Sequence, residues 1–299
     1  MTLRHLRIFK EVCELKSVTK AANKLYIAQP AVSVAIAELE KKYDVKLFQR
    51  IKNRMVITSA GKQLYERALT VLNNFDDFES TADESGKTCG LKIGASLTIG
   101  TFLLPAMIKK IREFYPAVKL QIKIFPKNSV EKMVLTGELD FGLVENSVTD
   151  THLDAREFFE DKLVAVCSPD YPAPEKLRFK DADKYDFILR ESGSASREKF
   201  EQLAKKHSAA VTPFIETVNP QAAESCAAAG LGIAVLPLSM VRARLDRGEL
   251  RTVPVVDADF KRSYCLITHK QKVFSSLQKE ITELCVNMGK EYKSGPENF

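Results

Sequence analysis

Residues 3–43 carry apolar side chains at helical spacing, which predicts three helices. The first spans residues 3–15, and one face holds Leu3, Leu6, Ile8, Phe9, Val12 and Leu15. Ser17 or Thr19 can cap the second helix. The third enters at Gln29 and Pro30, where a first-turn proline is tolerated. Its inward face carries Val32, Ile36 and Leu39. A short helix, a tight turn and a second helix are typical of a helix-turn-helix, which places its second helix in the major groove.

Two short strand-like runs follow, Val45–Phe48 and Met55–Ile57. The segment between them carries three cations, which are Arg50, Lys52 and Arg54. A basic hairpin tip beside a helix-turn-helix is typical of a wing that contacts DNA phosphates. The alternative is a solvated loop without a partner.

From residue 59 to about residue 84 no proline interrupts the pattern, and a long helix is expected. Its apolar positions repeat at heptad spacing, at Leu64, Ala68, Val71, Phe75, Phe78 and Ala82. Such a seam is buried either against the same helix of a second chain, which gives a dimer, or against the rest of its own chain. Residues 84–87 are expected to form a hinge.

Beyond residue 90 the pattern changes to alternating strands and helices. The first series places strands at residues 91–95, 118–124 and 141–144. The second series places them at residues 163–167, 187–190 and 233–236. Alternation of this kind predicts two α/β lobes with largely parallel sheets, side by side around a cleft.

Polar residues follow several of these strands, where ligands of open α/β sheets bind. In the first series they are Ser96, Thr98, Glu145 and Asn146. In the second series they lie in a loop rich in serine and glycine, with Ser194, Ser196 and Arg197. Hydroxyls, helix N-termini and a guanidinium suit a small anion. The alternative is that the serines serve only as turn and helix-cap residues.

Net charge is concentrated in the N-terminal fifth of the chain. Residues 1–67 hold 14 Lys/Arg and 6 Asp/Glu, a net charge of +8, whereas the remainder holds 31 and 33, a net charge of −2. A basic segment on a nearly neutral body is typical of a nucleic-acid-binding head, although a solvated lysine-rich surface has the same composition.

The composition otherwise describes an ordinary globular protein of 299 residues, long enough for about two domains. Six scattered cysteines without a CxxC pair and four dispersed histidines predict neither a metal site, nor a cofactor, nor a disulfide framework. The first ten residues are polar and charged, and no apolar run reaches the ~18 residues of a membrane span. We therefore expect a cytoplasmic protein.

Signatures of enzymes are incomplete in this chain. Gly94–Thr98 lacks the final glycine of a nucleophile elbow, and Gly230–Gly232 lacks the third glycine of a dinucleotide fingerprint. No phosphate-binding GxxxxGK[ST] loop is present, and Glu145 has no recognisable nucleophile to activate. The sequence predicts binding rather than catalysis, with no catalytic residue.

A set of N-terminal motifs stands in a characteristic order and spacing: Ala21-Ala22, Leu25, Gln29-Pro30-Ala31-Val32-Ser33, Ile36, Leu39-Glu40, Leu47-Phe48, Arg50, Thr58 and Ala60-Gly61. Two more lie in the body, at Gly137–Val144 and Gly230–Pro237. With these motifs the chain resembles LysR-type transcriptional regulators over about residues 3–290.

The resemblance implies a winged helix-turn-helix in residues 1–58, a dimerising linker helix in residues 59–87 and an effector-binding domain in residues 88–299. That α/β domain would resemble type 2 periplasmic binding proteins. Lobe I would comprise about 88–160 and 268–299, and lobe II about 161–267, with crossings near 160 and 267. Members of this family bind promoter DNA, usually as homotetramers, and a small effector changes DNA bending or contact with RNA polymerase.

Arg190-Glu191 and Gly193–Arg197 resemble the branch that controls carbon dioxide fixation and sulfite or cysteine metabolism. That branch more often reads GSGTR, so Ala195 and Ser196 depart from it. The resemblance implies an anionic effector, namely a sulfur oxyanion, a carboxylate or a phosphorylated metabolite.

In the DNA-reading helix, Ala28 and Val34-Ala35 replace residues that are more often polar in the family. We therefore expect base contacts from Gln29 and Ser33, with apolar contact from Val34 to a thymine methyl group. The principal interpretation is a ligand-responsive transcription factor. A solute-binding protein or an enzyme using the same two-lobed cleft are the rival classes.

Overall fold

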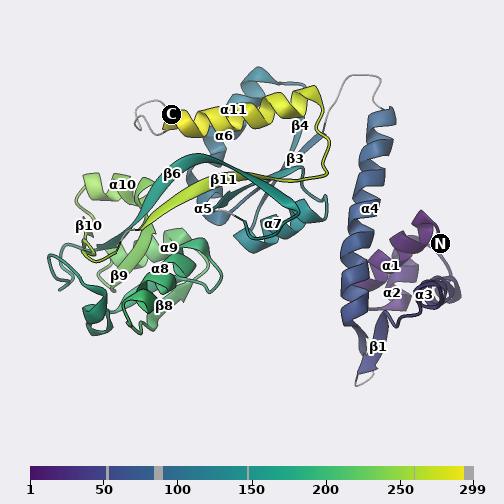
Figure 1. The fold of residues 1–299 in the computed structure, drawn as a ribbon, viewed down its shortest axis with the longest axis horizontal. Helices are drawn as coiled ribbons and strands as arrows, with labels where there is room; N and C mark the ends of the chain where they lie inside the picture. Colours follow the sequence, from purple (N-terminus) through teal and green to yellow (C-terminus); the bar gives the residue numbers. More distant parts are fainter. Residues whose placement is uncertain (52–53, 84–89, 147, 259, 293–299) are drawn as a thin grey trace. The chain divides into compact units, whose positions relative to one another are not determined.

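The computed structural model describes residues 1–51, 54–83, 90–146, 148–258 and 260–292. It divides into two compact units, one of residues 1–89 with 135–138 and one of residues 90–134 with 139–299 (Figure 1). The N-terminal unit contains three short helices, a hairpin and a long helix. Their bounds are α1 Leu3–Leu15, α2 Val18–Leu25, α3 Gln29–Tyr43, β1 Phe48–Ile51, β2 Arg54–Ile57 and α4 Ser59–Asp83.

Local sequence accounts for the boundaries of the head helices. The Ser17 hydroxyl caps α2 by accepting from the Lys20 amide, as predicted. Tyr26 ends α2 in a left-handed conformation with φ 55°, which turns the chain sharply into α3. Pro30 lies in the first turn of α3, where its missing amide hydrogen costs nothing. The expected helix-turn-helix is therefore present.

The core of the head joins all three helices to the hairpin and to α4. Its buried residues are Leu6, Ile8, Phe9, Val12, Ala21, Ala22, Val32, Ala35, Ile36, Leu39, Leu47, Ala68 and Leu72. Phe9 is fully buried, and its ring packs edge-on against Phe48 and Tyr65, with centroids 5.7 and 6.4 Å away. The small side chains of Ala21 and Ala22 are buried where α2 packs against its neighbours.

The hairpin differs in detail from the sequence expectation. The first strand was predicted at Val45–Phe48, but β1 begins at Phe48 and continues to Ile51. It pairs antiparallel with β2, so that Arg50 lies opposite Met55 and Ile51 opposite Arg54. Arg50 and Arg54 thus belong to the strands rather than to a six-residue tip. Lys52 lies outside the described residues, as does the expected hinge at 84–87.

Lobe I of the C-terminal unit is a sheet between two helical layers (Figure 1). Its elements are β3 Gly90–Ala95, α5 Leu97–Phe102, α6 Leu104–Phe114, β4 Lys119–Ile124, α7 Lys127–Leu135, β5 Phe141–Glu145 and α11 Ser276–Tyr292. Alternation along β3 decides the layers: Ile93 and Ala95 belong to the core with α6 and α11, whereas Gly94 faces Val130 of α7. Leu103 separates α5 from α6.

Lobe II is built in the same way. Its elements are a 3₁₀ helix η1 Phe179–Lys184, β7 Phe187–Arg190, α8 Ala195–Lys206, β8 Pro213–Thr217, α9 Pro220–Ala228, β9 Ile233–Pro237, α10 Leu238–Asp246 and β10 Arg251–Thr252. Phe187 and Leu189 pack with Phe200 of α8, while Ile188 packs with Ala223 and Ala227 of α9. Burial on both faces explains why these strands read as continuous apolar runs.

Two long strands, β6 Leu153–Cys167 and β11 Lys261–His269, connect the lobes (Figure 1). The strand order is β4-β3-β5-β11-β6-β9-β7-β8, with β10 paired to β6. Only the end of β6, at residues 163–167, was predicted as a strand from the sequence. The second crossing was expected near 267, but Tyr264 to Thr268 pair with β5 of lobe I and Phe260 packs in lobe II. The chain therefore returns near residue 260.

Candidate DNA-reading face and ligand cavity

The outer face of α3 presents the side chains that were predicted to read DNA. Gln29, Pro30, Ser33 and Val34 are all exposed, and Val34 is 55% exposed although it is apolar. The opposite face is held in the head core through Val32, Ile36 and Leu39. The structure thus brings the four predicted residues of α3 together on one exposed helix surface.

Two side chains on this face interact with each other. The amide Nε2 of Gln29 donates a hydrogen bond of 3.0 Å to Oγ of Ser33, one helical turn later. The bond leaves the Gln29 carbonyl oxygen and the Ser33 hydroxyl hydrogen available to base edges. Tyr26, which precedes α3 and is 95% exposed, was not singled out from the sequence. Its only sequence signal was its place in the turn.

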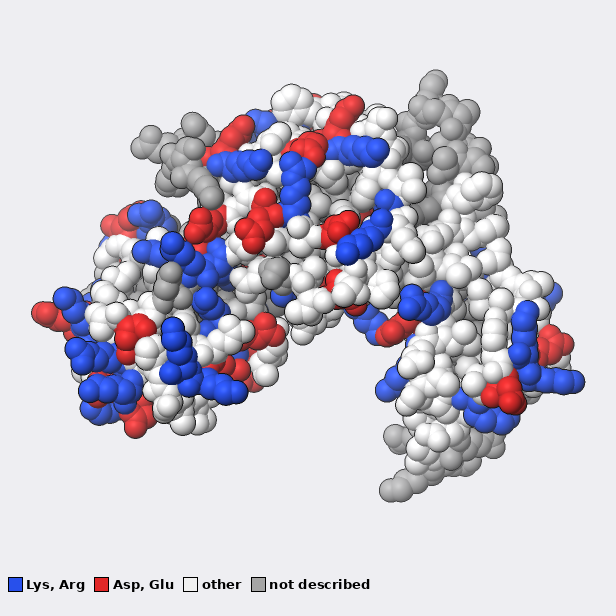
Figure 2. Space-filling model, viewed as in Figure 1, with Lys and Arg blue, Asp and Glu red and all other residues white. Residues whose placement is uncertain are grey.

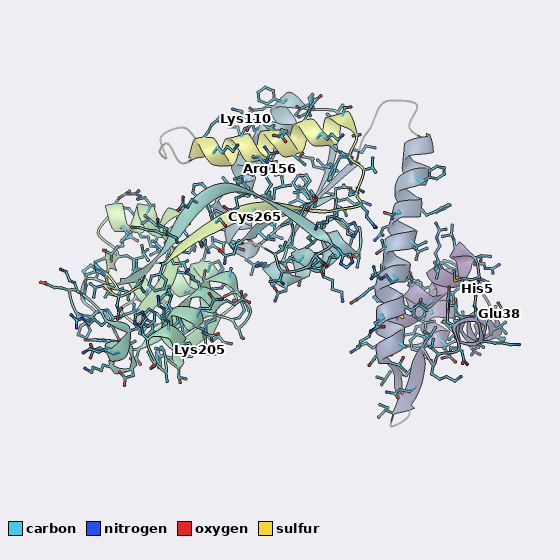
Figure 3. The ribbon with its side chains drawn as sticks, viewed as in Figure 1. His5, Glu38, Lys110, Arg156, Lys205 and Cys265 are labelled. Atoms are coloured by element: carbon cyan, nitrogen blue, oxygen red, sulfur yellow. The ribbon has the colours of Figure 1, made fainter. Side chains whose placement is uncertain are left out.

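The C-terminal half of α3 is connected to neighbouring elements by polar contacts. The His5 imidazole of α1 lies 2.7 Å from a carboxylate oxygen of Glu38 in α3 (Figure 3). Glu40 accepts from the backbone amide of Leu47 at 2.8 Å and pairs with Lys46 at 2.7 Å. The position of the helix relative to α1 and to the start of β1 is therefore specified by side chains as well as by packing.

The electrostatics of Glu40 favour its ionised form. Burial would raise its pKa, but the Lys46 ammonium and the amides of Leu47 and Phe48 outweigh burial and hold the pKa below its ordinary value. Other carboxylates of the head balance part of its positive charge: Lys10 and Lys24 pair with Glu11 at 3.5 and 2.7 Å. On the body, acidic and basic side chains are interspersed over the face in view (Figure 2).

The heptad seam of α4 divides into two parts. Leu64 and Ala68 pack into the core of the head, which is the alternative to a dimer interface. Further along, Val71 is 47% exposed and Phe78 is 68% exposed, and the Phe75 ring contacts Phe78. The first half of the seam is thus used within the chain, while the second half presents apolar side chains on its surface.

A small cavity lies between the two lobes of the C-terminal unit. It is lined by Ser96, Leu97, Thr98, Pro126, Lys127, Glu145, Arg190, Glu191, Ser194, Ala195 and Ser196. Five of the six residues predicted for the effector site line it together, three from lobe I and two from lobe II. Each of those five is buried, with exposure between 2% and 9%. The ends of β3 and β5 and the N-terminus of α8 position them.

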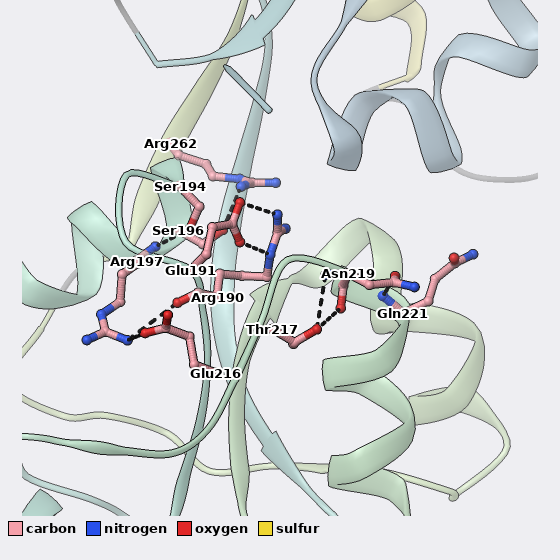
Figure 4. A network of polar contacts seen from close by, with 10 residues as sticks. All are labelled: Arg190, Glu191, Ser194, Ser196, Arg197, Glu216, Thr217, Asn219, Gln221 and Arg262. Carbon is pink, nitrogen blue, oxygen red and sulfur yellow. Dashed lines mark hydrogen bonds and ion pairs between the residues drawn. The ribbon is translucent and has the colours of Figure 1, made fainter. Parts of the chain in front are cut away.

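Two of these serines are also helix caps. The Ser96 hydroxyl accepts from the Ile99 amide at 3.4 Å, and the Ser194 hydroxyl accepts from the Arg197 amide at 3.2 Å (Figure 4). Both serines therefore act as helix caps. Capping uses an oxygen lone pair and leaves the hydroxyl hydrogen for a ligand, so the same serine can serve both purposes.

Arg197 differs from its predicted place. Its Nε donates to Glu201 at 2.6 Å, and its Nη1 lies 3.6 Å from a carboxylate oxygen of Glu216 (Figure 4). The guanidinium is not among the described groups that line the cavity. The guanidinium in the cavity wall is instead that of Arg190, at the end of β7. Its Nε and Nη2 donate to the two carboxylate oxygens of Glu191, at 2.9 and 3.1 Å.

A buried polar network lies beside the cavity, on the crossing strands. Nη1 of Arg262 donates to the Ser196 hydroxyl at 3.2 Å (Figure 4), and its Nη2 contacts the Tyr264 hydroxyl. Tyr264 and Ser239 both donate to Oδ2 of Asp161, at 2.9 and 2.8 Å. Burial would lower the pKa of Arg262, but Tyr264, Glu145 and Asp161 raise it. The guanidinium is therefore a permanent positive charge behind Ser196.

Lys127, Glu191 and Arg262 were not predicted as site residues from the sequence. Arg190 was named only as part of the family motif. Lys127 and Arg262 are separated in sequence from the serine loops, and only the lobe packing brings them near.

The described residues contain no group of three or more His, Cys, Asp or Glu that could hold a metal ion. Among those same residues, no helix is both long and apolar enough to cross a membrane.

A winged helix-turn-helix joined to a two-lobed α/β ligand domain defines a class of ligand-responsive DNA-binding regulators. Residues 3–62 match the family described as bacterial regulatory helix-turn-helix protein, lysR family. Residues 86–289 match the LysR substrate binding domain. The chain belongs to the LysR family of transcriptional regulators, and the resemblance stated from the sequence is confirmed. It is a DNA-binding regulator and not an enzyme.

Three curated relatives span nearly the whole chain. An uncharacterised HTH-type transcriptional regulator of Escherichia coli, YeiE, is 32% identical over 95% of this chain and 97% of its own length. The regulator CysL of Bacillus subtilis is 28% identical over 92% and 93%. A probable RuBisCO transcriptional regulator of Cyanidium caldarium is 28% identical over 99% and 97%. These relatives confirm the predicted branch.

A solved structure supports the fold over the same span. A full-length OxyR variant of Pseudomonas aeruginosa has a TM-score of 0.67 at 22% identity, and the match covers 96% of this chain and 94% of that one. The expected architecture, a helix-turn-helix followed by a two-lobed α/β domain, is confirmed.

Proposed function

We propose that this regulator reads promoter DNA with the exposed face of α3 and with its basic hairpin, and that a small anionic effector in the cavity between its lobes changes that binding. Gln29 and Ser33 would contact base edges, and Val34 a thymine methyl group. Pro30 sets the entry of the helix, and Arg50, Lys52 and Arg54 would contact phosphates. Tyr26 is a further candidate because its ring is exposed beside α3.

The proposal of an effector site rests on one observation: both lobes contribute side chains to the same polar cavity. Ser96, Thr98 and Glu145 come from lobe I, and Ser194 and Ser196 from lobe II, yet all five line the same small cavity. Arg190 supplies a guanidinium fork for a sulfur oxyanion, a carboxylate or a phosphorylated acid. Arg197, directed elsewhere, would act only through the position of α8.

The remaining parts of the proposal concern assembly. Residues 1–58, 59–87 and 88–299 would act as DNA-binding, linker and effector-binding domains. The exposed half of the α4 seam supports dimerisation through this helix, because Val71 and Phe78 leave apolar surface to bury. Two such dimers would form a homotetramer on two half-sites, in contact with RNA polymerase and in the cytoplasm.

A thermal-shift experiment on the full-length protein tests the effector site. The panel contains sulfite, sulfate, thiosulfate, phosphate, O-acetylserine and phosphorylated sugar acids at constant ionic strength. A ligand at 100 times its Kd adds ~2.7 kcal/mol to the unfolding free energy of the domain that binds it. Ser196→Ala should abolish the shift. Asn219→Ala is the matched control, because Asn219 caps α9 in the same lobe and does not line the cavity.

A shift in the parent protein that survives Ser196→Ala would place the ligand elsewhere. The DNA half is tested separately, by comparing affinity for the regulator's own upstream DNA with affinity for scrambled DNA of equal length. Equal affinities at physiological salt would contradict sequence-specific reading.

A further inference from the structure

We propose that Glu191 is a built-in competitor for the effector, which holds the Arg190 guanidinium and must release it before an anion can bind. This inference rests on the proposed effector cavity and concerns its regulation and its choice of ligand. The carboxylate of Glu191 occupies both donors with the geometry that a bound carboxylate or oxyanion would adopt (Figure 4).

The two partners differ in how firmly they are held. Arg190 ends the buried strand β7, its side chain is 5% exposed, and its carbonyl accepts from Nη1 of Arg197 at 3.4 Å. Glu191 begins the loop that leads to α8, its side chain is 18% exposed, and Gly193 gives this loop a left-handed residue at φ 85°. Rotation of the Glu191 side chain toward solvent can therefore free the guanidinium while the strand stays in place.

The charges in the cavity wall determine how strongly Glu191 competes with an anion for Arg190. Among the described lining residues, the cations Lys127 and Arg190 are matched by the carboxylates Glu145 and Glu191. An arriving anion meets an Arg190 guanidinium that is already paired with Glu191, and this tethered carboxylate competes at high effective concentration. A monoanionic carboxylate would replace one carboxylate on Arg190 by another, so it would gain little binding free energy. A dianionic oxyanion gains more from the guanidinium, so the free site should favour dianions.

Competition of this kind reduces apparent affinity by the fraction of molecules in the open form. If the closed pair outweighs the open form by about ten to one, removing Glu191 tightens anion binding about tenfold. The gain should be the same for a monoanion and for a dianion that both need the open form, because the fraction of closed molecules does not depend on the ligand.

Isothermal titration of the full-length protein with inorganic phosphate, sulfate and acetate, at constant ionic strength, tests the inference. Glu191→Gln is expected to tighten binding about tenfold or more, and Arg190→Gln in the same background should remove the gain. Glu191→Ala repeats the test without an amide in place of the carboxylate. Glu201→Gln is the matched control, because Glu201 pairs with Arg197 outside the cavity and should leave each Kd unchanged.

The outcomes separate the two proposals. Probe binding to the parent protein that needs Ser196, with the same or a weaker Kd in both Glu191 variants, would overturn the competitor and leave the effector site standing. Failure of every probe to bind the parent protein and both Glu191 variants would overturn both. Tighter binding in Glu201→Gln as well would show a general charge effect and also overturn the competitor.

Discussion

Glu40 offers a direct test of how the recognition helix is held. Its carboxylate accepts from the amides of Leu47 and Phe48, at 2.8 and 3.4 Å, and pairs with Lys46 at 2.7 Å. Replacing Glu40 by alanine leaves these groups without their acceptor, at a site where Leu47 is fully buried. Loss of a hydrogen bond to a charged group costs about 1.5–3 kcal/mol. We expect a loss of about 2 kcal/mol of local stability at the start of β1.

Hydrogen exchange of the full-length protein, followed on peptides covering residues 45–58, measures this quantity. A loss of about 2 kcal/mol corresponds to roughly 30-fold faster exchange, because each 1.4 kcal/mol is a factor of ten. Glu38→Ala is the matched control: its carboxylate pairs with His5, but the Glu38 side chain is 60% exposed. Exposed pairs contribute about 0–1 kcal/mol, so the control should change exchange by less than about fivefold.

The lowered pKa of Glu40 also predicts how the stability of this contact depends on pH. Because the folded-state pKa of Glu40 is lowered, its contribution is fully present above the pKa of the unfolded chain. It is lost as the pH falls through the lowered pKa of the folded state. Slower exchange in Glu40→Ala than in Glu38→Ala, or equal exchange in the two, would refute this account of how α3 is joined to the hairpin.

Three further changes test other surfaces. Arg50→Ala or Arg54→Ala should each weaken DNA binding about evenly across sequences and lower the salt slope by roughly 1, and an unchanged slope in a salt titration would contradict phosphate contact. Ser33→Ala should alter discrimination between operators in competition binding, whereas equal losses on all DNA would argue against base reading. Phe78→Glu should shift the full-length protein toward monomer in sedimentation velocity, and an unchanged sedimentation coefficient would exclude the exposed part of α4 from the interface.

Much of the fold could be predicted from local sequence, because short-range physics decides it. Helical spacing and capping residues located α1, α2 and α3 correctly, and the outward face of α3 follows from burying Val32, Ile36 and Leu39. Continuous apolar runs located the buried parallel strands. The polar residues after β3 and β5 and at the start of α8 were assigned to one site, because ligand-binding residues of α/β sheets lie at strand ends.

Tertiary packing decided what these local signals left open. The heptad spacing of α4 could not show that Leu64 and Ala68 pack into the head while Phe78 remains exposed. Arg197 was the predicted anion ligand, but the orientation of α8 directs it to Glu201 and Glu216, and Arg190 lines the cavity instead. Arg262 reaches Ser196 across 66 residues of sequence. Contacts between distant segments depend on how the lobes pack, and neither periodicity nor residue spacing carries that information.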